Sequence, residues 1–395
     1  MYRTGSLLSR TRNVQHVSTG STAGRVLMAN TTCAPWLNEY VDWHTTNRYA
    51  ADARYLVYTC RPEMPGAGQG GHCFGFGDRF RLIGYMLRAA ALYRRVLLVD
   101  WASPVDISEF FAPPVLHGAG GRTIEWRLTQ AERDALSEQK VLRWLGPEPE
   151  PPGDRYVRVV GNSPWQSRLG RGPGMGEFDA PSLGCLLRVL FTPSTSLNAV
   201  VAHRRRELFG SSGYDGVHLR LGDAAPGTAF RPGTVPRTDV RMSVDDALEV
   251  LSCLDSAGHT PLFVATDNAR LKAAILAGSG RGGASVPDAG VLLPSHLAGR
   301  VKSQGCADCM VNPVFLHNFN YSDVADIFIE MLLLSQSRCF HYSGSNFAAI
   351  VMALAPPSHC NLPYRGRGAR APVMPKEPTP EQLAKFKLWR CTKAR

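Results

Sequence analysis

The apolar positions of the chain alternate between continuous runs and helical repeats over two separate stretches. The first stretch runs from a continuous apolar segment at 54–60 to a second at 96–101, with a helical repeat beginning near Asp78 between them. Continuous apolar runs of this length are typical of strands in a parallel sheet that is covered on both faces. The pattern predicts a β-α-β unit, with a glycine-rich loop at 66–77 before its helix.

The second stretch begins at residue 213 and repeats this alternation more regularly. The pattern predicts strands at 217–221, 261–265, 291–293 and 339–342, and helices at 243–258, 267–276, 322–335 and 345–354. A capping box at 379–382 predicts one more short helix, over 383–389. Strands that alternate with helices are typical of parallel sheets, so we expect the α/β fold class.

Length and composition indicate more than one folded unit. A chain of 395 residues exceeds the size of a single core, and its 38 glycines and 28 prolines indicate many loops. We expect an extension over 1–50, a Rossmann-like domain over 51–205, a second such domain over 206–365 and a tail with a short helix over 366–395. The start of the chain is basic, rich in Ser and Thr and free of acidic residues as far as residue 38, which is typical of targeting segments and disordered stems.

The formal net charge of +11 suits a negatively charged ligand. The basic residues are scattered, and the short basic run at 203–207 is more typical of a solvated helix face, so we do not expect nucleic acid as a partner. No run of 18 apolar residues is present, and the sequence therefore predicts no transmembrane segment in this chain.

The ten cysteines leave the compartment open between an oxidising and a reducing one. Cys306 and Cys309 form a single CxxC without a second pair, which favours a short disulfide or two thiols over zinc, and we expect no metal site. Glycosylation sequons at Asn30 and Asn320 mildly favour the secretory pathway. We expect the Golgi or ER lumen, with another organelle or the cytoplasm as the alternative.

Three groups of polar residues stand where strands of the second stretch end. They are His218 with Arg220, then Asp267, and then the Ser-Gly-Ser segment that starts at Ser343. Alternation along a strand puts His218 and Arg220 on one face, and parallel strands bring their carboxyl ends to one edge of the sheet. We therefore expect these residues to converge on one anionic ligand, for which a nucleoside diphosphate has the right chemistry.

Each residue also has a purely structural explanation. Arg220 would then pair with a carboxylate, His218 would be an interior histidine, and Asp267 and Ser343 would begin helices. In the first stretch, the glycines of residues 75–79 (GFGDR) lack the spacing of a dinucleotide fingerprint. Those glycines serve either a tight turn or the close approach of the backbone to a sugar.

Four segments together resemble the GDP-fucose-dependent fucosyltransferases, the inverting group that includes protein O-fucosyltransferases and the α1,6- and α1,2-fucosyltransferases. The segments are similar to the family's glycine loop (GFGDR, 75–79), its HxRxxD signature (HLRLGD, 218–223), its ATD segment (FVATD, 263–267) and its serine-rich motif (FHYSGSNF, 340–347). The similarity extends in order over residues 54–356, and the HxRxxD signature is its most specific part.

This resemblance implies a fold of the GT-B type, with two Rossmann-like domains facing a central cleft and no cofactor or metal. It implies that Arg220 binds the β-phosphate, that His218 lies near the diphosphate and sugar, and that Asp267 reads guanine. It further implies a donor site that includes Gly75, Gly77, Ser343, Ser345 and Asn346, with phosphate oxygens bound by the last three. Asp223 would orient the loop that carries Arg220.

The chain departs from the family pattern at the general base. Where the α1,6-type pattern has a glutamate after a Gly-Thr pair, Gly227 and Thr228 are followed by Ala229 and Phe230. Three alternatives follow: Asp78 or Asp223 acts as the base, GDP departs ahead of attack with Arg220 stabilising its charge, or the chain binds the donor without catalysis.

We expect an enzyme, a glycosyltransferase that moves fucose from GDP-fucose to a hydroxyl of a protein or glycan with inversion. The alternatives are transfer of another nucleotide deoxysugar or inactive binding of a nucleotide sugar. The sequence predicts neither the acceptor nor the linkage.

Overall fold

The computed structural model describes most of the chain from residue 33 to residue 363. The described residues are 33–61, 75–115, 122–137, 154–160, 180–221, 244–257, 260–278, 295–298, 300–303, 321–356 and 359–363. The predicted strand at 291–293, the CxxC pair and the predicted C-terminal helix lie outside them.

The predicted β-α-β unit is confirmed. Its strands are β1 (Tyr55–Cys60) and β2 (Val96–Trp101), joined by α2 (Phe76–Leu92), and they pair in parallel. Every residue of both strands is buried, which explains why their sequences are continuously apolar rather than alternating. With β4 (Tyr156–Val159), which pairs in parallel on the other side of β1, they form the first sheet, in the order β2-β1-β4.

Helix α1 (Pro35–Asn47) corrects the predicted extension over residues 1–50. It begins with proline, a residue that suits the first turn of a helix. Its buried Tyr40 hydroxyl donates to the Arg95 carbonyl at 2.9 Å and accepts from the Leu97 N–H at 3.0 Å. The part of the chain from Pro35 onward is therefore folded against the first sheet, and the boundary at residue 50 was drawn too late.

Short elements connect the first sheet to the rest of the fold. They are η2 (Ile107–Glu109), β3 (Phe111–Ala112), α3 (Gln130–Ser137), α5 (Ala180–Leu190), β5 (Thr192–Pro193) and α6 (Thr195–Phe209). Strands β3 and β5 form a small antiparallel pair, and the Cys33–Cys185 disulfide ties the start of the described chain to α5. Helix α6 runs without interruption through the domain boundary that we expected at residue 205.

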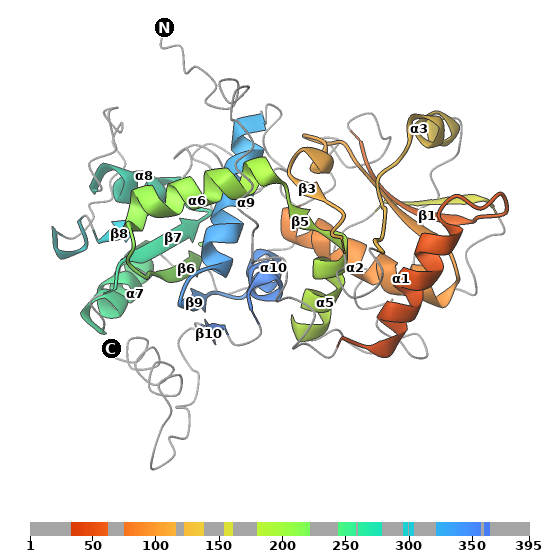
Figure 1. The fold of residues 1–395 in the computed structure, drawn as a ribbon. Coiled ribbons are helices and arrows are strands. Elements are labelled where there is room, and N and C mark those ends of the chain that lie inside the picture. The colour runs from red at the N-terminus through yellow and green to blue at the C-terminus, as the bar shows by residue number, and fades with distance from the viewer. Residues whose placement is uncertain are drawn as a thin grey trace, which may run out of the picture. The chain divides into compact units, whose positions relative to one another are not determined.

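The second sheet contains β6 (Asp215–Leu219), β7 (Leu262–Thr266), β8 (Val301–Lys302), β9 (Cys339–Tyr342) and β10 (Cys360–Pro363). Its strands are all parallel, in the order β10-β9-β6-β7-β8 (Figure 1). The helices of this stretch are α7 (Val244–Ala257), α8 (Ala269–Gly278), η4 (Ser295–Leu297), α9 (Tyr321–Ser335) and α10 (Asn346–Leu354). The predicted α/β class is confirmed, whereas the arrangement of two domains around a cleft stays a prediction.

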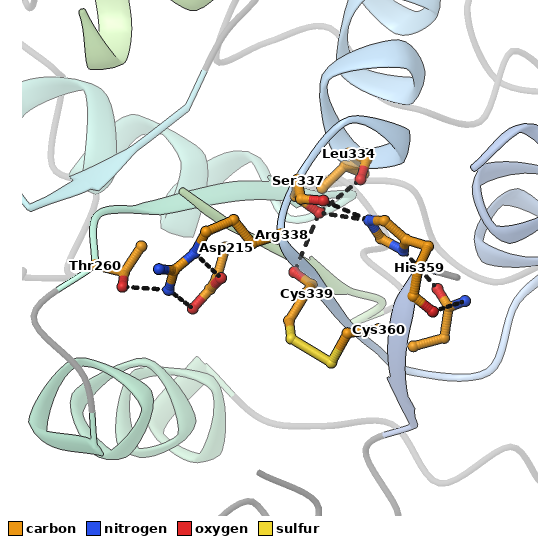
Figure 2. Close-up of a disulfide and its surroundings, with 9 residues drawn as sticks. Asp215, Thr260, Leu334, Ser337, Arg338, Cys339, His359 and Cys360 are labelled. Carbon is orange, nitrogen blue, oxygen red and sulfur yellow. Dashed lines mark hydrogen bonds and ion pairs between the residues drawn. A yellow bond between two sulfur atoms is a disulfide. The ribbon is translucent and has the colours of Figure 1, made fainter. Parts of the chain in front are cut away.

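Strand β10 was not predicted, because its four residues are half polar and end in proline. It is held at the edge of the second sheet by the disulfide between Cys339 and Cys360, which are partners in the β9–β10 register. Figure 2 shows this disulfide beside His359, whose Nε2 lies 2.5 Å from the Ser337 carbonyl oxygen. The disulfide thus fixes a short edge strand whose Leu362 is buried in the apolar cluster of the second sheet.

Helix α10 joins the two parts of the core. It packs against α9, which lies near the second sheet, and also against α2 and α5 from the first part of the chain (Figure 1). One continuous apolar cluster includes residues of all four helices, and within it the ring of Phe328 contacts those of Phe76, Phe80 and Phe111. The start of α10, where the serine-rich segment lies, is therefore placed by helices from both ends of the sequence.

Candidate functional site

The carboxyl ends of β6, β7 and β9 lie side by side. In the register of the second sheet His218 pairs with Ala265 of β7 and with Tyr342 of β9. The three polar groups that follow these strands in sequence therefore meet at one edge, as the order of parallel strands requires.

Ser343 connects the end of β9 to the end of β6. Its backbone N–H donates to the His218 carbonyl at 3.0 Å, which continues the strand pairing by one residue. Its hydroxyl oxygen accepts the N–H of Arg220 at 2.8 Å. The serine thus holds the backbone of Arg220 in place, a function that requires no ligand.

His218 is buried beneath this edge. Its side chain stacks on the ring of Phe347, with centroids 5.1 Å apart, and its Nδ1 has no hydrogen-bond partner among the described residues. Burial, reinforced by the nearby charge of Arg220, lowers the pKa of His218 to about 4, although Asp267 and the Ser343 backbone oppose the shift. At neutral pH the ring is therefore an uncharged imidazole, and its Nδ1 is buried without a partner in the described part of the chain.

Arg220 stands directly after β6 and is exposed. Among the described residues no carboxylate forms an ion pair with its guanidinium, so the structural explanation that Arg220 neutralises an acid finds no support there. An arginine in this position offers a fork of N–H donors that matches two oxygens of a phosphate.

Asp267 and Asn268, which precede α8, have different roles. The Asn268 side chain caps α8, because its Oδ1 accepts the N–H of Leu271 at 2.8 Å. The Asp267 carboxylate instead reaches across to β6 and accepts the N–H of Leu221 at 2.7 Å. Asp267 is therefore not the helix cap, and it fixes the segment that follows Arg220.

The start of α10 contributes backbone donors. Ser345 is the N-cap, and its hydroxyl accepts the N–H of Ala348 at 3.0 Å. Gly344 before it is exposed, with no atom of the structure within 4 Å of where a Cβ would stand. The first N–H groups of a helix and its dipole favour an anion at such an end.

Asn346 faces α2 with both ends of its amide. Its Nδ2 donates to the Asp78 carboxylate, and its Oδ1 accepts from the Arg81 guanidinium. Arg81 was not among the predicted site residues. It lies three residues after Asp78, on the same face of α2. The predicted role of Asn346 as a phosphate ligand stays a prediction.

The two glycines of the first segment have different surroundings. Gly75 is the N-cap of α2 in an extended conformation. A Cβ at Gly77 would stand 2.5 Å from the carbonyl carbon of Asn346 and 2.6 Å from the nitrogen of Phe347. The close approach at Gly77 is thus between two helices, a partner that the sequence did not indicate.

Asp223 and the segment at 227–230 lie outside the described residues. The structure therefore leaves the predicted role of Asp223 untested, and of the two acids considered as a base it describes only Asp78. Within the described ranges no group of His, Cys, Asp and Glu side chains could hold a metal ion. Those same ranges contain no helix that is long and apolar enough to cross a membrane.

Comparison with solved structures finds similarity at low sequence identity. A mutant of FUT1 from Arabidopsis thaliana in complex with GDP is 15% identical, with a TM-score of 0.47 over 85% of this chain and 80% of that one. The NodZ α-1,6-fucosyltransferase soaked with GDP-fucose is 15% identical, with a TM-score of 0.41 over 77% of this chain and 93% of that one. NodZ from Bradyrhizobium is 14% identical, with a TM-score of 0.42 over 77% and 94%.

No protein-family model matches the chain, and no curated protein matches it by sequence. The NodZ structures are of the class that the four sequence segments resemble. Since identities near 15% and TM-scores below 0.5 do not transfer an activity, the functional argument rests on the residues of this chain.

Proposed function

We propose that this protein transfers fucose from GDP-fucose to a hydroxyl of a protein or glycan, with inversion at the anomeric carbon. One observation supports this most: the exposed guanidinium of Arg220, the buried His218, whose Nδ1 has no hydrogen-bond partner among the described residues, and the start of α10 all lie at one edge of a parallel sheet. This edge is where α/β proteins bind nucleotides, and its chemistry suits a diphosphate.

Arg220 has the central part in the proposed reaction. The acceptor oxygen attacks the anomeric carbon of fucose while the bond from that carbon to the β-phosphate oxygen breaks, and the bonding electrons leave with GDP. Negative charge therefore grows on the β-phosphate, where Arg220 and the N–H groups at the start of α10 stabilise it. The acceptor proton passes to a base or to water.

His218 would act as an uncharged hydrogen-bond partner of the diphosphate or sugar. Since burial lowers its pKa to about 4, the His218 ring is uncharged at neutral pH before a donor binds. A bound diphosphate would favour the protonated form, so we expect donor binding to raise the pKa of His218.

Guanine recognition by Asp267 rests on the resemblance of residues 263–267 to the ATD segment. A carboxylate has several acceptor positions, so its hydrogen bond to Leu221 is compatible with a second one to a base. Asp267 would then connect the nucleotide to the loop of Arg220.

We further propose that the protein works in the Golgi or ER lumen. All six described cysteines are in disulfides: Cys33 is bonded to Cys185, Cys339 is bonded to Cys360, and Cys60 and Cys253 are disulfide-bonded as well. Disulfides persist in oxidising compartments, and this usage favours the secretory pathway over the cytoplasm.

Calorimetric titration of the purified protein tests the donor. We expect GDP and GDP-fucose to bind, UDP and dTDP sugars not to bind, and the affinities to be the same with EDTA as with Mg²⁺ or Mn²⁺. Failure of GDP to bind, or a preference for UDP, would contradict the proposal.

Product formation separates an enzyme from an inactive binder. Incubation with GDP-fucose and a panel of peptide and glycan acceptors should release GDP and yield fucosylated products whose inverted anomeric configuration is read by NMR. Turnover of GDP-rhamnose but not GDP-fucose would identify the other deoxysugar as the substrate. Tight GDP binding without turnover or hydrolysis would instead identify a binding protein.

A further inference from the structure

We propose that Asp78 is a positioning residue, which holds the start of α10 through Asn346 so that the helix can bind the diphosphate, and that it is not the general base. This inference rests on the proposed function, and it decides between roles that the sequence left open for Asp78. The contact joins residues 268 positions apart in the sequence, one at the start of α2 and one at the start of α10.

The side-chain chemistry of the contact fixes the orientation of Asn346. An ionised carboxylate only accepts hydrogen bonds and a guanidinium only donates them. Asp78 therefore takes the Nδ2 end of the amide and Arg81 takes the Oδ1 end. Reversal of the amide would oppose donor to donor and acceptor to acceptor, so α2 recognises one orientation only.

The position of Asn346 makes this orientation matter to the ligand site. Asn346 is the first residue of α10, directly after its cap Ser345. The next residue, Phe347, carries the ring on which His218 stacks. A displacement of Asn346 would therefore move both the N–H groups offered to a diphosphate and the support of the buried histidine.

The backbones of α2 and α10 meet closely at the same point. Gly77, next to Asp78, leaves no room for a Cβ, because that atom would lie within 2.8 Å of three backbone atoms of Asn346 and Phe347. Two helices in such contact transmit a shift of one to the other, since packed backbones have no slack. The side-chain contact and the glycine together place α10 relative to α2.

The conservative variant Asp78→Asn distinguishes positioning from base catalysis. It keeps an oxygen that accepts the Asn346 N–H but cannot take a proton from the acceptor. We expect Asp78→Asn to bind GDP within about threefold of the wild type and to keep turnover and its pH profile, whereas Asp78→Ala should weaken GDP binding about tenfold because the contact is lost. Asp134→Ala, which removes an exposed carboxylate from α3, is the matched control and should change neither GDP affinity nor turnover.

A reciprocal exchange tests the contact directly. Asn346→Asp alone opposes two carboxylates and should weaken GDP binding at least as much as Asp78→Ala. Combined with Asp78→Asn it restores a donor facing an acceptor and keeps the charge beside Arg81, so the double variant should recover most of the lost affinity. No recovery in a folded double variant would overturn the proposal.

Amide hydrogen exchange supplies a measurement that needs no ligand. The first turn of α10 should exchange faster in Asp78→Ala than in the wild type or in Asp78→Asn. If the wild type bound no GDP but this difference were seen, the proposed function would fail while the positioning contact would stand. If GDP bound and Asp78→Asn lost turnover at unchanged affinity, Asp78 would be the base and the inference would be wrong.

Discussion

Arg61 and Arg220 occupy equivalent places in the two parallel sheets, yet their surroundings differ. Each directly follows a strand, β1 in the first sheet and β6 in the second. Arg61 donates to the buried Asp100 carboxylate at 2.7 Å, and Arg158 lies 4.0 Å from the same carboxylate. Arg220 has no such acid among the described residues. Among the described residues, a carboxylate therefore neutralises the cation at the first edge and none neutralises the cation at the second.

Two buried polar side chains, Arg48 beside the first sheet and His218 in the second, differ in whether their polar atoms have hydrogen-bond partners. Arg48, beside the first sheet, is paired with Glu132 through two hydrogen bonds and donates to two backbone carbonyls as well. His218, under the edge of the second sheet, has an Nδ1 with no partner among the described residues. A group satisfied by its own chain stabilises the fold. A missing partner alone does not mark a ligand site, because the buried His44 Nδ1 beside the first sheet also has none among the described residues; His218 differs in lying next to the exposed Arg220.

The largest effect is expected from breaking the pair beside the first sheet. Glu132→Ala should lower the free energy of unfolding by about 3–5 kcal/mol, because it leaves the buried guanidinium of Arg48 without its acid. Urea titration measures the change. Glu125→Ala, which removes an acid paired with the half-exposed Arg127, should cost less than about 1 kcal/mol. Equal costs would show that burial does not distinguish the two pairs.

Acid should destabilise the protein through its buried histidines. Burial lowers the pKa of His44, His218 and His341 to about 4. Since the unfolded chain binds their protons near pH 6.5, stability is full above that pH and falls as the pH drops toward 4, by about 3 kcal/mol for each histidine.

Urea titrations between pH 7 and pH 4 measure this fall. His341→Leu should flatten the slope by up to about 1.4 kcal/mol per pH unit. GDP should reduce the fall in the wild type by stabilising protonated His218. A slope unchanged by His341→Leu would show that this histidine is not buried in its neutral form.

Replacement of each of the two matched arginines, Arg220 and Arg61, by alanine tests the comparison itself. Arg220→Ala should weaken GDP binding by about 2–3 kcal/mol, roughly 30- to 160-fold, and leave the melting temperature unchanged. Arg61→Ala should lower the melting temperature and leave GDP affinity unchanged, because Asp100 loses a hydrogen-bond partner while the donor site is untouched. Calorimetry measures GDP affinity and thermal unfolding measures stability for both variants. Unchanged GDP affinity in Arg220→Ala would contradict the proposal that Arg220 binds the phosphate.

The smallest effect is expected at Ser343. Loss of its hydroxyl leaves the Arg220 N–H without its acceptor, and Ser343→Ala should weaken GDP binding by about 1 kcal/mol, roughly fivefold. Ser194→Ala removes a comparable hydrogen bond at the start of α6, so it should lower stability without changing GDP affinity. A loss of GDP affinity as large as that of Arg220→Ala would indicate that Ser343 itself contacts the phosphate.

The sequence determined the first β-α-β unit, strands β6, β7 and β9 with the helices around them, and the edge where the candidate site lies, but not β4, β8, α3, α5 or α6. Apolar periodicity and turn residues act over short distances, and parallel strands joined by helices must place His218, Asp267 and Ser343 at one edge. Helix α1 was missed because the basic, hydroxyl-rich composition before it was taken to extend past Pro35. Strand β10 was missed because it is only four residues long and a disulfide, set by the tertiary fold, helps to hold it beside β9.

Only the tertiary structure decided which of these polar groups have partners. The Asp78–Asn346 contact, the Asp267–Leu221 hydrogen bond and the helix contact at Gly77 each join segments distant in the chain. No local pattern predicts such contacts, because they depend on how the helices and strands pack. Whether a residue such as Arg220 serves the fold or a ligand is therefore settled by what the rest of the chain places beside it.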